Sequence, residues 1–217
     1  MIAVEEFLGA ARQGDTEALG RMLDADPGLA AARNHLGQSA ILLAKYHRQQ
    51  AVVDFLLSRQ PELTLHEACA VGAGERVRHL LRERGRLIDT HSTDGFTPLA
   101  LACFFGHTEI AAWLVDHGAN IDLAATNQMK VAPIHAAVAA RQFAIVEMLV
   151  SSGANVNARQ QHGYTPLHAA AQNGDIQTVR LLIGKGADVG ARSENGQTAL
   201  DMAMQQGHGA VAELLSA

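Results

Sequence analysis

Apolar residues recur at helical spacing along most of the chain, in short runs that glycine or proline separates. The clearest example lies between residues 165 and 183, where residues 167–171 and residues 176–183 are apolar at the spacing of a helix face. Gly174 lies between the two runs and favours a tight turn. Pro166 suits the first turn of a helix, and Thr165 before it can cap that helix. The pattern predicts two short antiparallel helices.

The segment after the second helix has a different character. Gly184 and Gly186 are expected to end that helix, and residues 187–192 then run to the next apolar stretch as a short extended segment, which we call a finger. A unit of two short helices and one finger cannot bury both faces of its helices alone. Stacked neighbours can, so the pattern predicts a quasi-linear solenoid.

Three sets of residues recur in constant order and mark the repeat. The turn between the two helices of a unit is marked by Gly14, Arg48, Gly72, Gly106, Arg141, Gly174 and Gly207, which are 34, 24, 34, 35, 33 and 33 residues apart. Upstream of the turn lie Thr97-Pro98-Leu99, Ala132-Pro133-Ile134-His135, Thr165-Pro166-Leu167-His168 and Thr198-Ala199-Leu200. Downstream lie Gly118-Ala119-Asn120, Gly153-Ala154-Asn155 and Gly186-Ala187-Asp188.

This pattern resembles the ankyrin repeat, over nearly the whole chain and most specifically in residues 94–191, and the type it suggests is a short all-ankyrin chain of bacterial kind. The resemblance implies a mainly α-helical solenoid of helix-turn-helix units with short β-hairpin fingers, in a single domain spanning residues 1–217. About seven units are predicted, at residues 1–33, 34–60, 61–90, 91–125, 126–158, 159–191 and 192–217.

One spacing departs from the family pattern. Arg48 and Gly72 are 24 residues apart, about ten short of a full unit. The chain passes from Ser58 almost directly to Pro61, which can open the next helix. We therefore expect the finger between the second and third units to be missing, and we expect a gap in the row of fingers at that place.

Six exposed positions stand out as candidate partner-binding residues. In ankyrin-type proteins the partner usually meets the concave side, which is built from finger tips and exposed positions of the first helix of each unit. By resemblance these positions include Gln38, Tyr46 and His47 in the second unit, and Phe96, Phe104, Phe105, Met129, Val131 and Tyr164 in the fourth to sixth units. The last six form an apolar strip, which on a protein surface usually marks an interaction site. The alternative is that Phe104 or Phe105 packs into the core beside the missing finger.

Composition narrows the classes of function. The net charge is −5, which argues against a broad nucleic-acid-binding surface, although a local basic patch is compatible with it. The first 15 residues lack the basic and long apolar segments of a signal peptide, and no apolar run is long enough for a membrane span. We expect a soluble, cytoplasmic monomer that binds neither nucleic acid nor membrane. Cys69 and Cys103 lie in apolar helical runs and are expected to be buried free thiols.

Motifs that could carry catalysis are incomplete. His66-Glu67-Ala68-Cys69 begins like a zinc-protease helix but has alanine at position 70, where the second histidine ligand would stand. The 11 histidines are spread along the repeat, and by resemblance those assigned to one slot, His66, His135 and His168, are structural. We therefore expect no enzyme, cofactor or metal site. The predicted function is a scaffold or adaptor that binds a partner protein on its concave face. The alternative is a regulatory subunit that modulates a bound enzyme or transcription factor.

Overall fold

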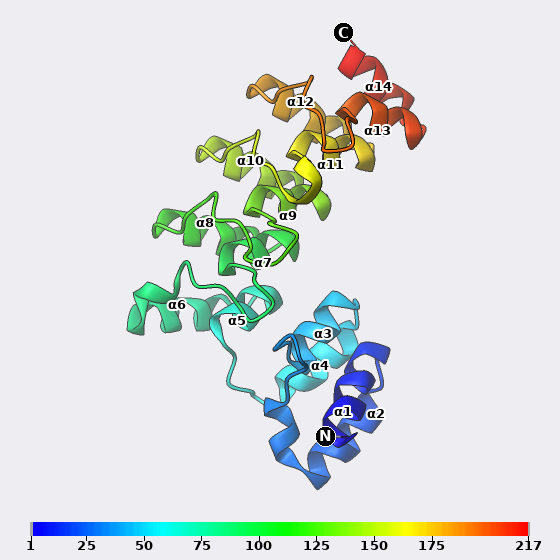
Figure 1. Ribbon diagram of the computed structural model, residues 1–217. Helices are drawn as coiled ribbons and strands as arrows, with labels where there is room; N and C mark the ends of the chain where they lie inside the picture. Colours follow the sequence, from blue (N-terminus) through cyan, green and yellow to red (C-terminus); the bar gives the residue numbers. More distant parts are fainter. Residues whose placement is uncertain (1, 217) are drawn as a thin grey trace.

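A computed structural model describes residues 2–216, which form fourteen α-helices in seven antiparallel pairs (Figure 1). The α-helices are α1 (Ile2–Gln13), α2 (Thr16–Ala25), α3 (Ala40–Tyr46), α4 (Gln50–Ser58), α5 (Leu65–Val71), α6 (Gly74–Glu83), α7 (Pro98–Phe104), α8 (Thr108–Asp116), α9 (Pro133–Ala139), α10 (Phe143–Ser151), α11 (Pro166–Asn173), α12 (Ile176–Gly184), α13 (Ala199–Gln205) and α14 (Gly209–Ser216). Three short 3-10 helices are η1 (Pro27–Ala31), η2 (Gly85–Leu87) and η3 (Gln161–Gly163). None of the helices in residues 2–216 is long and apolar enough to cross a membrane.

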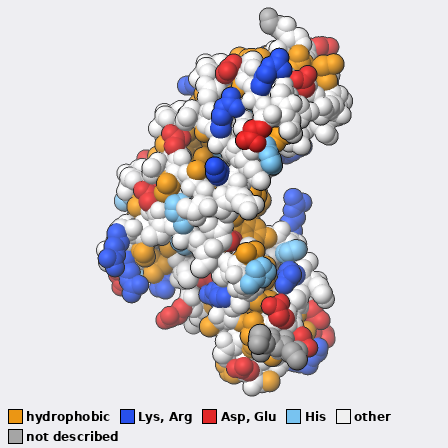
Figure 2. Space-filling view, in the orientation of Figure 1, with side chains coloured by type: hydrophobic (Ala, Val, Ile, Leu, Met, Phe, Trp, Pro, Cys, Tyr) orange, Lys and Arg blue, Asp and Glu red, His pale blue; other side chains and the backbone are white. Residues whose placement is uncertain are grey.

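The odd-numbered helices stack on one another from α1 to α13 and form the inner row of the solenoid. The even-numbered helices form the outer row, in which α6, α8, α10, α12 and α14 pack in sequence. The stack curves, and the inner row faces the hollowed side of the molecule (Figures 1 and 2). The core lies between the two rows and between successive pairs, where Leu99, Ile134, Leu167 and Leu182 are at most 1% exposed. The fold class predicted from the pattern is confirmed.

The local sequence explains where the inner helices begin and how they turn. Helices α7, α9 and α11 each begin at the predicted proline, where no backbone N–H is needed. The turn after each inner helix uses a left-handed residue, and Arg48 and Arg141 adopt it at φ 58° although they carry side chains. Both arginines therefore occupy the slot that glycine fills in the other units, as the spacing predicted.

The fingers of the regular part are tight turns joined to one another by backbone hydrogen bonds. Ser92 N–H donates to Phe96 O at 2.9 Å and closes one finger, and equivalent bonds of 2.9 Å close the next three fingers. Neighbouring fingers are linked by Thr126 N–H to Gly95 O, Gln161 N–H to Met129 O and Glu194 N–H to His162 O, at 2.8–2.9 Å. In residues 2–216 the one β-bridge joins Arg33 and Ser39, so the fingers are hairpin-like turns rather than paired strands.

The connection between α4 and α5 departs from the other units in two ways. Residues 59–64 join the helices directly, without a finger. Helix α5 begins at Leu65 rather than near Pro61, which corrects the predicted start. The reason is a capping box: Thr64 Oγ1 accepts from Glu67 N–H at 3.2 Å, and Glu67 Oε2 accepts from Thr64 N–H at 2.9 Å. These bonds satisfy N–H groups at the helix start that have no partner within the helix.

The predicted gap in the row of fingers is wrong. Residues 34–38, which precede α3, lie directly against residues 92–96, which precede α7. A Cβ atom on Gly37 would lie 2.0 Å from Thr93 Oγ1, so the two turns are in close contact. Gln38 Nε2 donates to Asp94 Oδ2 at 3.0 Å across this contact. The two fingers therefore meet over the place of the missing one, while the inner helices α3, α5 and α7 remain stacked.

Candidate partner-binding groove on the concave face

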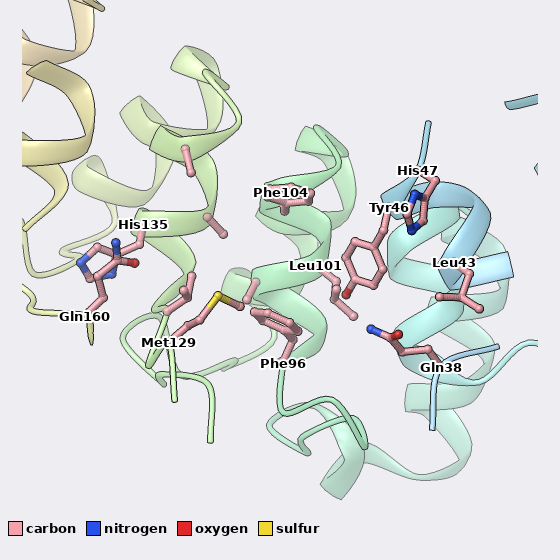
Figure 3. Close-up of a pocket in the computed structure, with 14 residues that line it drawn as sticks. Gln38, Leu43, Tyr46, His47, Phe96, Leu101, Phe104, Met129, His135 and Gln160 are labelled. Atoms are coloured by element: carbon pink, nitrogen blue, oxygen red, sulfur yellow. The ribbon is translucent and has the colours of Figure 1, made fainter. Parts of the chain in front are cut away.

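A groove of about 550 Å³ lies on the concave side, across α3, α7 and α9 and the fingers beside them (Figure 3). Four of the six predicted site residues line it, namely Phe96, Phe104, Met129 and Val131. The remaining lining residues are Gln38, Leu43, Tyr46, His47, Ala100, Leu101, His135, Ala136, Ala139 and Gln160. The groove is therefore mainly apolar, with a small number of polar side chains at its edges.

Three elements position the apolar side chains of the groove. Phe104 is the last residue of α7 and is 39% exposed, while Met129 lies in the finger before α9 and is 45% exposed. Phe96 is half-buried and immediately precedes Thr97, whose hydroxyl accepts from Ala100 N–H and caps α7. Figure 3 shows Phe96 and Met129 lying side by side. Leu101 forms part of the floor at 2% exposure.

One wall of the groove is held by a polar contact between α3 and the finger before α7. The Tyr46 hydroxyl donates to Asp94 Oδ2 at 3.2 Å, and Gln38 Nε2 donates to the same oxygen. Burial raises the pKa of Tyr46 far above its ordinary value, and the Asp94 carboxylate adds to the rise, so the phenol stays protonated and remains a donor. This contact fixes the Tyr46 ring along the groove.

His135 lines the groove, but its ring nitrogens are both engaged. Burial lowers the pKa of His135 to about 4, which keeps the ring neutral at pH 7. Its Nδ1 accepts from Ala132 N–H at 3.2 Å, so the proton is on Nε2, which donates to Ala158 O at 3.1 Å. His135 therefore ties the start of α9 to the following finger and has a structural role.

Comparison with known protein families identifies the type of repeat that forms this groove. The family described as ankyrin repeats (3 copies) matches residues 65–160 and 153–217. The chain belongs to the ankyrin repeat family. A human protein, BCL-6 corepressor-like protein 1, is 30% identical over 94 residues, which are 43% of this chain and 5% of that protein. The similarity thus covers a small part of that relative.

Two of the predicted site residues lie outside the groove of this ankyrin array. The Phe105 ring packs 5.5 Å from the Tyr46 ring and 5.1 Å from the Phe104 ring, and Lys45 Nζ lies 4.9 Å above it. Phe105 thus joins α7 to α3 at the junction with the missing finger. Tyr164 is in the same finger as the lining residue Gln160 but does not itself line the groove, and its ring lies 5.6 Å from the ring of His168. The structure thus brings four of the six residues together in the groove, while Phe105 contacts Phe104 but packs against α3 and Tyr164 packs against His168.

His66, His135 and His168 were assigned to one structural slot, but His66 does not cap its helix as the other two do. His168 Nδ1 accepts from Thr165 N–H, as His135 does in its unit, and its Nε2 contacts Gln197 O at 3.0 Å. In α5 that capping position belongs to Glu67, and His66 stands one residue earlier. Helix α5 is one residue shorter between its cap and its turn, so His66 keeps only the bond to the next finger, from Nε2 to Thr90 O.

The sequence pattern did not indicate that α3 would line the same groove as α7 and α9. Gln38, Tyr46 and His47 were placed on the concave side, but their proximity to the fourth unit was not expected because a gap was predicted there. The short spacing between Arg48 and Gly72 was the available signal. It implied that the second unit would lie next to the finger of the fourth.

Residues 2–216 contain no set of three His, Cys, Asp or Glu side chains arranged to hold a metal ion. Cys69 and Cys103 are buried as free thiols, and burial raises the pKa of both well above the ordinary thiol value. Neither thiol is therefore a ready nucleophile. Ankyrin repeats are in general a non-catalytic family.

Proposed function

We propose that this chain is an interaction module, a scaffold or adaptor without catalytic activity, that binds a partner protein through the concave groove. The observation that carries the proposal is the groove itself: Phe104 and Met129, which are 39% and 45% exposed, both line it on a frame of ankyrin repeats. Large apolar side chains exposed together are uncommon on a protein surface unless they bind something. Apolar anchors of the partner would fill the groove between Tyr46, Phe96 and Val131.

The unit boundaries belong to this proposal as well. Continuous packing of the inner helices from α1 to α13 supports a single domain over residues 1–217, divided into about seven units. The finger contact between Gly37 and Thr93 supports treating residues 2–58 as part of the same array. A domain built in this way presents one concave surface to a partner.

The test compares two pairs of exposed apolar residues in a quantitative affinity capture. Phe104→Asp with Met129→Asp places two charges in the groove and should reduce partner recovery at least about tenfold. Leu36→Asp with Met204→Asp is the matched control, since both residues are exposed, at 48% and 65%, and neither lines the groove. The control should recover the partner as the unmodified protein does. Equal recovery by both variants would place the binding site elsewhere.

Phe105 needs separate treatment in this test. Changing Phe96 and Phe105 together would not separate binding from stability, because Phe96 lines the groove and Phe105 packs between α3 and α7. We therefore expect Phe105→Ser to lower the melting temperature, whereas Phe104→Asp should leave it nearly unchanged. The two phenylalanines are adjacent in sequence but have different roles in the proposal.

The alternative is a regulatory subunit that modulates a bound enzyme or transcription factor. The human relative is named as a corepressor-like protein, and this chain spans about 5% of its length. The two proposals use the same groove and differ in consequence. An activity or DNA-binding assay of the captured partner, with and without this chain, separates them: a change supports regulation, and no change supports a scaffold.

A further inference from the structure

The outer face carries a basic patch on a chain whose net charge is −5. Five of its 17 lysines and arginines lie between residues 76 and 86, namely Arg76, Arg78, Arg82, Arg84 and Arg86. Glu75 and Glu83 lie among residues 74–88, and Glu109 of α8 lies near Arg78, so three negative side chains accompany the five positive ones. Figure 2 shows basic side chains gathered at the left edge of the molecule, where Figure 1 places α6. The patch is therefore local and opposite in sign to the rest of the chain.

A cleft of about 540 Å³ lies beside this patch, between α6 and α8. Its lining combines Arg78 and Arg82 with apolar surface from Leu81, Ile88 and Trp113. The two arginines are four residues apart and so lie on the same side of α6. The Trp113 ring is stacked on the His117 ring at 3.7 Å between centroids. The cleft thus places two guanidinium groups next to an aromatic surface.

The guanidinium of Arg78 already holds a carboxylate. Glu75 Oε1 accepts from Arg78 Nη2 at 2.7 Å, although the Glu75 side chain is 86% exposed. Such an exposed pair contributes little to stability, so an external anion can replace or join it at small cost. Arg82 donates through Nε to Arg78 O at 3.3 Å, which leaves its terminal nitrogens to bind a ligand. Guanidinium groups pair with carboxylate and phosphate in a two-point geometry.

The class of ligand follows from charge and shape. A long polyanion such as duplex nucleic acid needs an extended basic track, and the remaining surface is acidic in balance. An anionic membrane would meet the same repulsion. A peptide needs only one or two anionic groups at the arginines, and its apolar neighbours can cover Leu81, Ile88 and Trp113. Arginine clusters are a known means of binding acidic or phosphorylated peptide motifs.

We propose that the α6–α8 cleft binds an acidic peptide segment of a partner protein. A carboxylate or phosphate of the segment lies against Arg78 and Arg82, and an adjacent apolar side chain lies against Trp113. This goes beyond the concave groove: the cleft is on the outer row of helices and shares no lining residue with the groove. The chain would thereby contact two segments on opposite sides, as a scaffold requires.

Trp113 is the single tryptophan of the chain, so its fluorescence reports on this cleft directly. The full chain is titrated with three short synthetic peptides that share a leucine and carry, next to it, two glutamates, one phosphoserine or two glutamines. The Trp113 emission should change and then level off as the glutamate peptide, the phosphoserine peptide or both are added. The peptide that binds more tightly identifies the anionic group. The glutamine peptide should bind at least about tenfold more weakly. Equal binding of the glutamine peptide, or no response to any peptide, would overturn the proposal.

Two variants with the same loss of charge test the geometry. Arg78→Gln with Arg82→Gln removes the cleft arginines and should weaken binding at least about tenfold. Arg84→Gln with Arg86→Gln removes two arginines that do not line the cleft and should change it less than about threefold. Equal weakening by the two double variants would show diffuse electrostatic attraction and contradict binding in the cleft.

Two other probes test the class of ligand. Tighter binding of a phosphatidylserine vesicle or a duplex oligonucleotide than of either anionic peptide would overturn the peptide assignment. The Phe104→Asp, Met129→Asp variant, which alters the concave groove, is the control and should bind the peptides normally.

Discussion

Residues 65–217, which match the ankyrin family, and residues 2–64, which lie outside the match, contain the same helix pairs but are joined by different contacts. In the matched region each finger donates a backbone hydrogen bond to the one before it. Where the two regions meet, side chains replace those bonds: Arg33 pairs with Glu67 at 3.1 Å, and Gln38 and Tyr46 both reach Asp94.

The difference shows which part of the unit the stack depends on. Helix α3 packs on α5 without a finger between their units, so burial of apolar helix faces is sufficient to keep the inner row continuous. The fingers then adjust to the spacing that the helices set. At this junction their adjustment brings Tyr46 and Phe96 into one groove.

The largest expected effect tests whether the matched region depends on its core. Leu167→Ala removes a side chain that is 1% exposed and should lower the free energy of unfolding by about 2–5 kcal/mol. Leu36→Ala, at 48% exposure, is the control and should change it by less than about 0.5 kcal/mol. Denaturant unfolding measures both. A loss below about 1 kcal/mol for Leu167→Ala would show that the register of α11 is wrong.

The next effect concerns pH and the histidine that joins α9 to the following finger. Because the folded-state pKa of His135 is lowered to about 4 from 6.5, the unfolded chain binds more protons between these values. Stability is therefore complete above about pH 6.5 and falls as the pH drops toward 4, by up to about 3 kcal/mol. Urea unfolding at pH 7 and pH 4.5 measures the difference.

The matched control for this histidine is His135→Gln, which cannot titrate in that range. It should be less stable than the unmodified protein at pH 7, because it loses a buried hydrogen-bonding ring, but its stability should fall less between pH 7 and pH 4.5. An equally steep fall in both proteins would assign the pH dependence to other groups.

A smaller effect compares a helix cap at the junction of the two regions with the equivalent cap in the last helix pair of the matched region. Glu67 and Asp201 both accept from the N-cap threonine, but Glu67 alone pairs with an arginine and is 4% exposed in its side chain. Glu67→Gln should cost about 1–3 kcal/mol in denaturant unfolding. Asp201→Asn keeps a similar cap without a lost ion pair and should cost about 1 kcal/mol or less. Equal losses would mean that the Arg33 pair does not stabilise the junction.

The smallest effect concerns the inter-helix turns. Arg141 adopts φ 58°, a left-handed conformation that disfavours side-chain residues, so Arg141→Gly should gain about 0.5 kcal/mol after the entropy of glycine is offset. Gly207→Ala is the reverse control, since φ is 73° and no atom lies within 4 Å of the new Cβ. It should lose about 1 kcal/mol. Thermal unfolding of both variants checks the signs, and a loss for Arg141→Gly would indicate that its side chain stabilises the turn.

The sequence predicted the candidate site in part. Phe96, Phe104, Met129 and Val131 could be placed on one face because they recur at exposed positions of a known unit. Phe105 could not be separated from Phe104 by this reasoning. Its role depends on how closely α3 approaches α7, and that distance is set by contacts between residues about 50 positions apart, such as Tyr46 and Asp94.

The helix pairs, the left-handed turns at Arg48 and Arg141 and the proline starts of α7, α9 and α11 were determined by the sequence alone. These features are local: they depend on capping, on backbone preference and on helical periodicity within one unit. The start of α5 is local as well, because the capping box of Thr64 and Glu67 sets it. Tertiary structure decided the closure of the fingers over the missing one and the composition of the groove. These depend on packing between units, which brings together residues far apart in the sequence, such as Gly37 and Thr93.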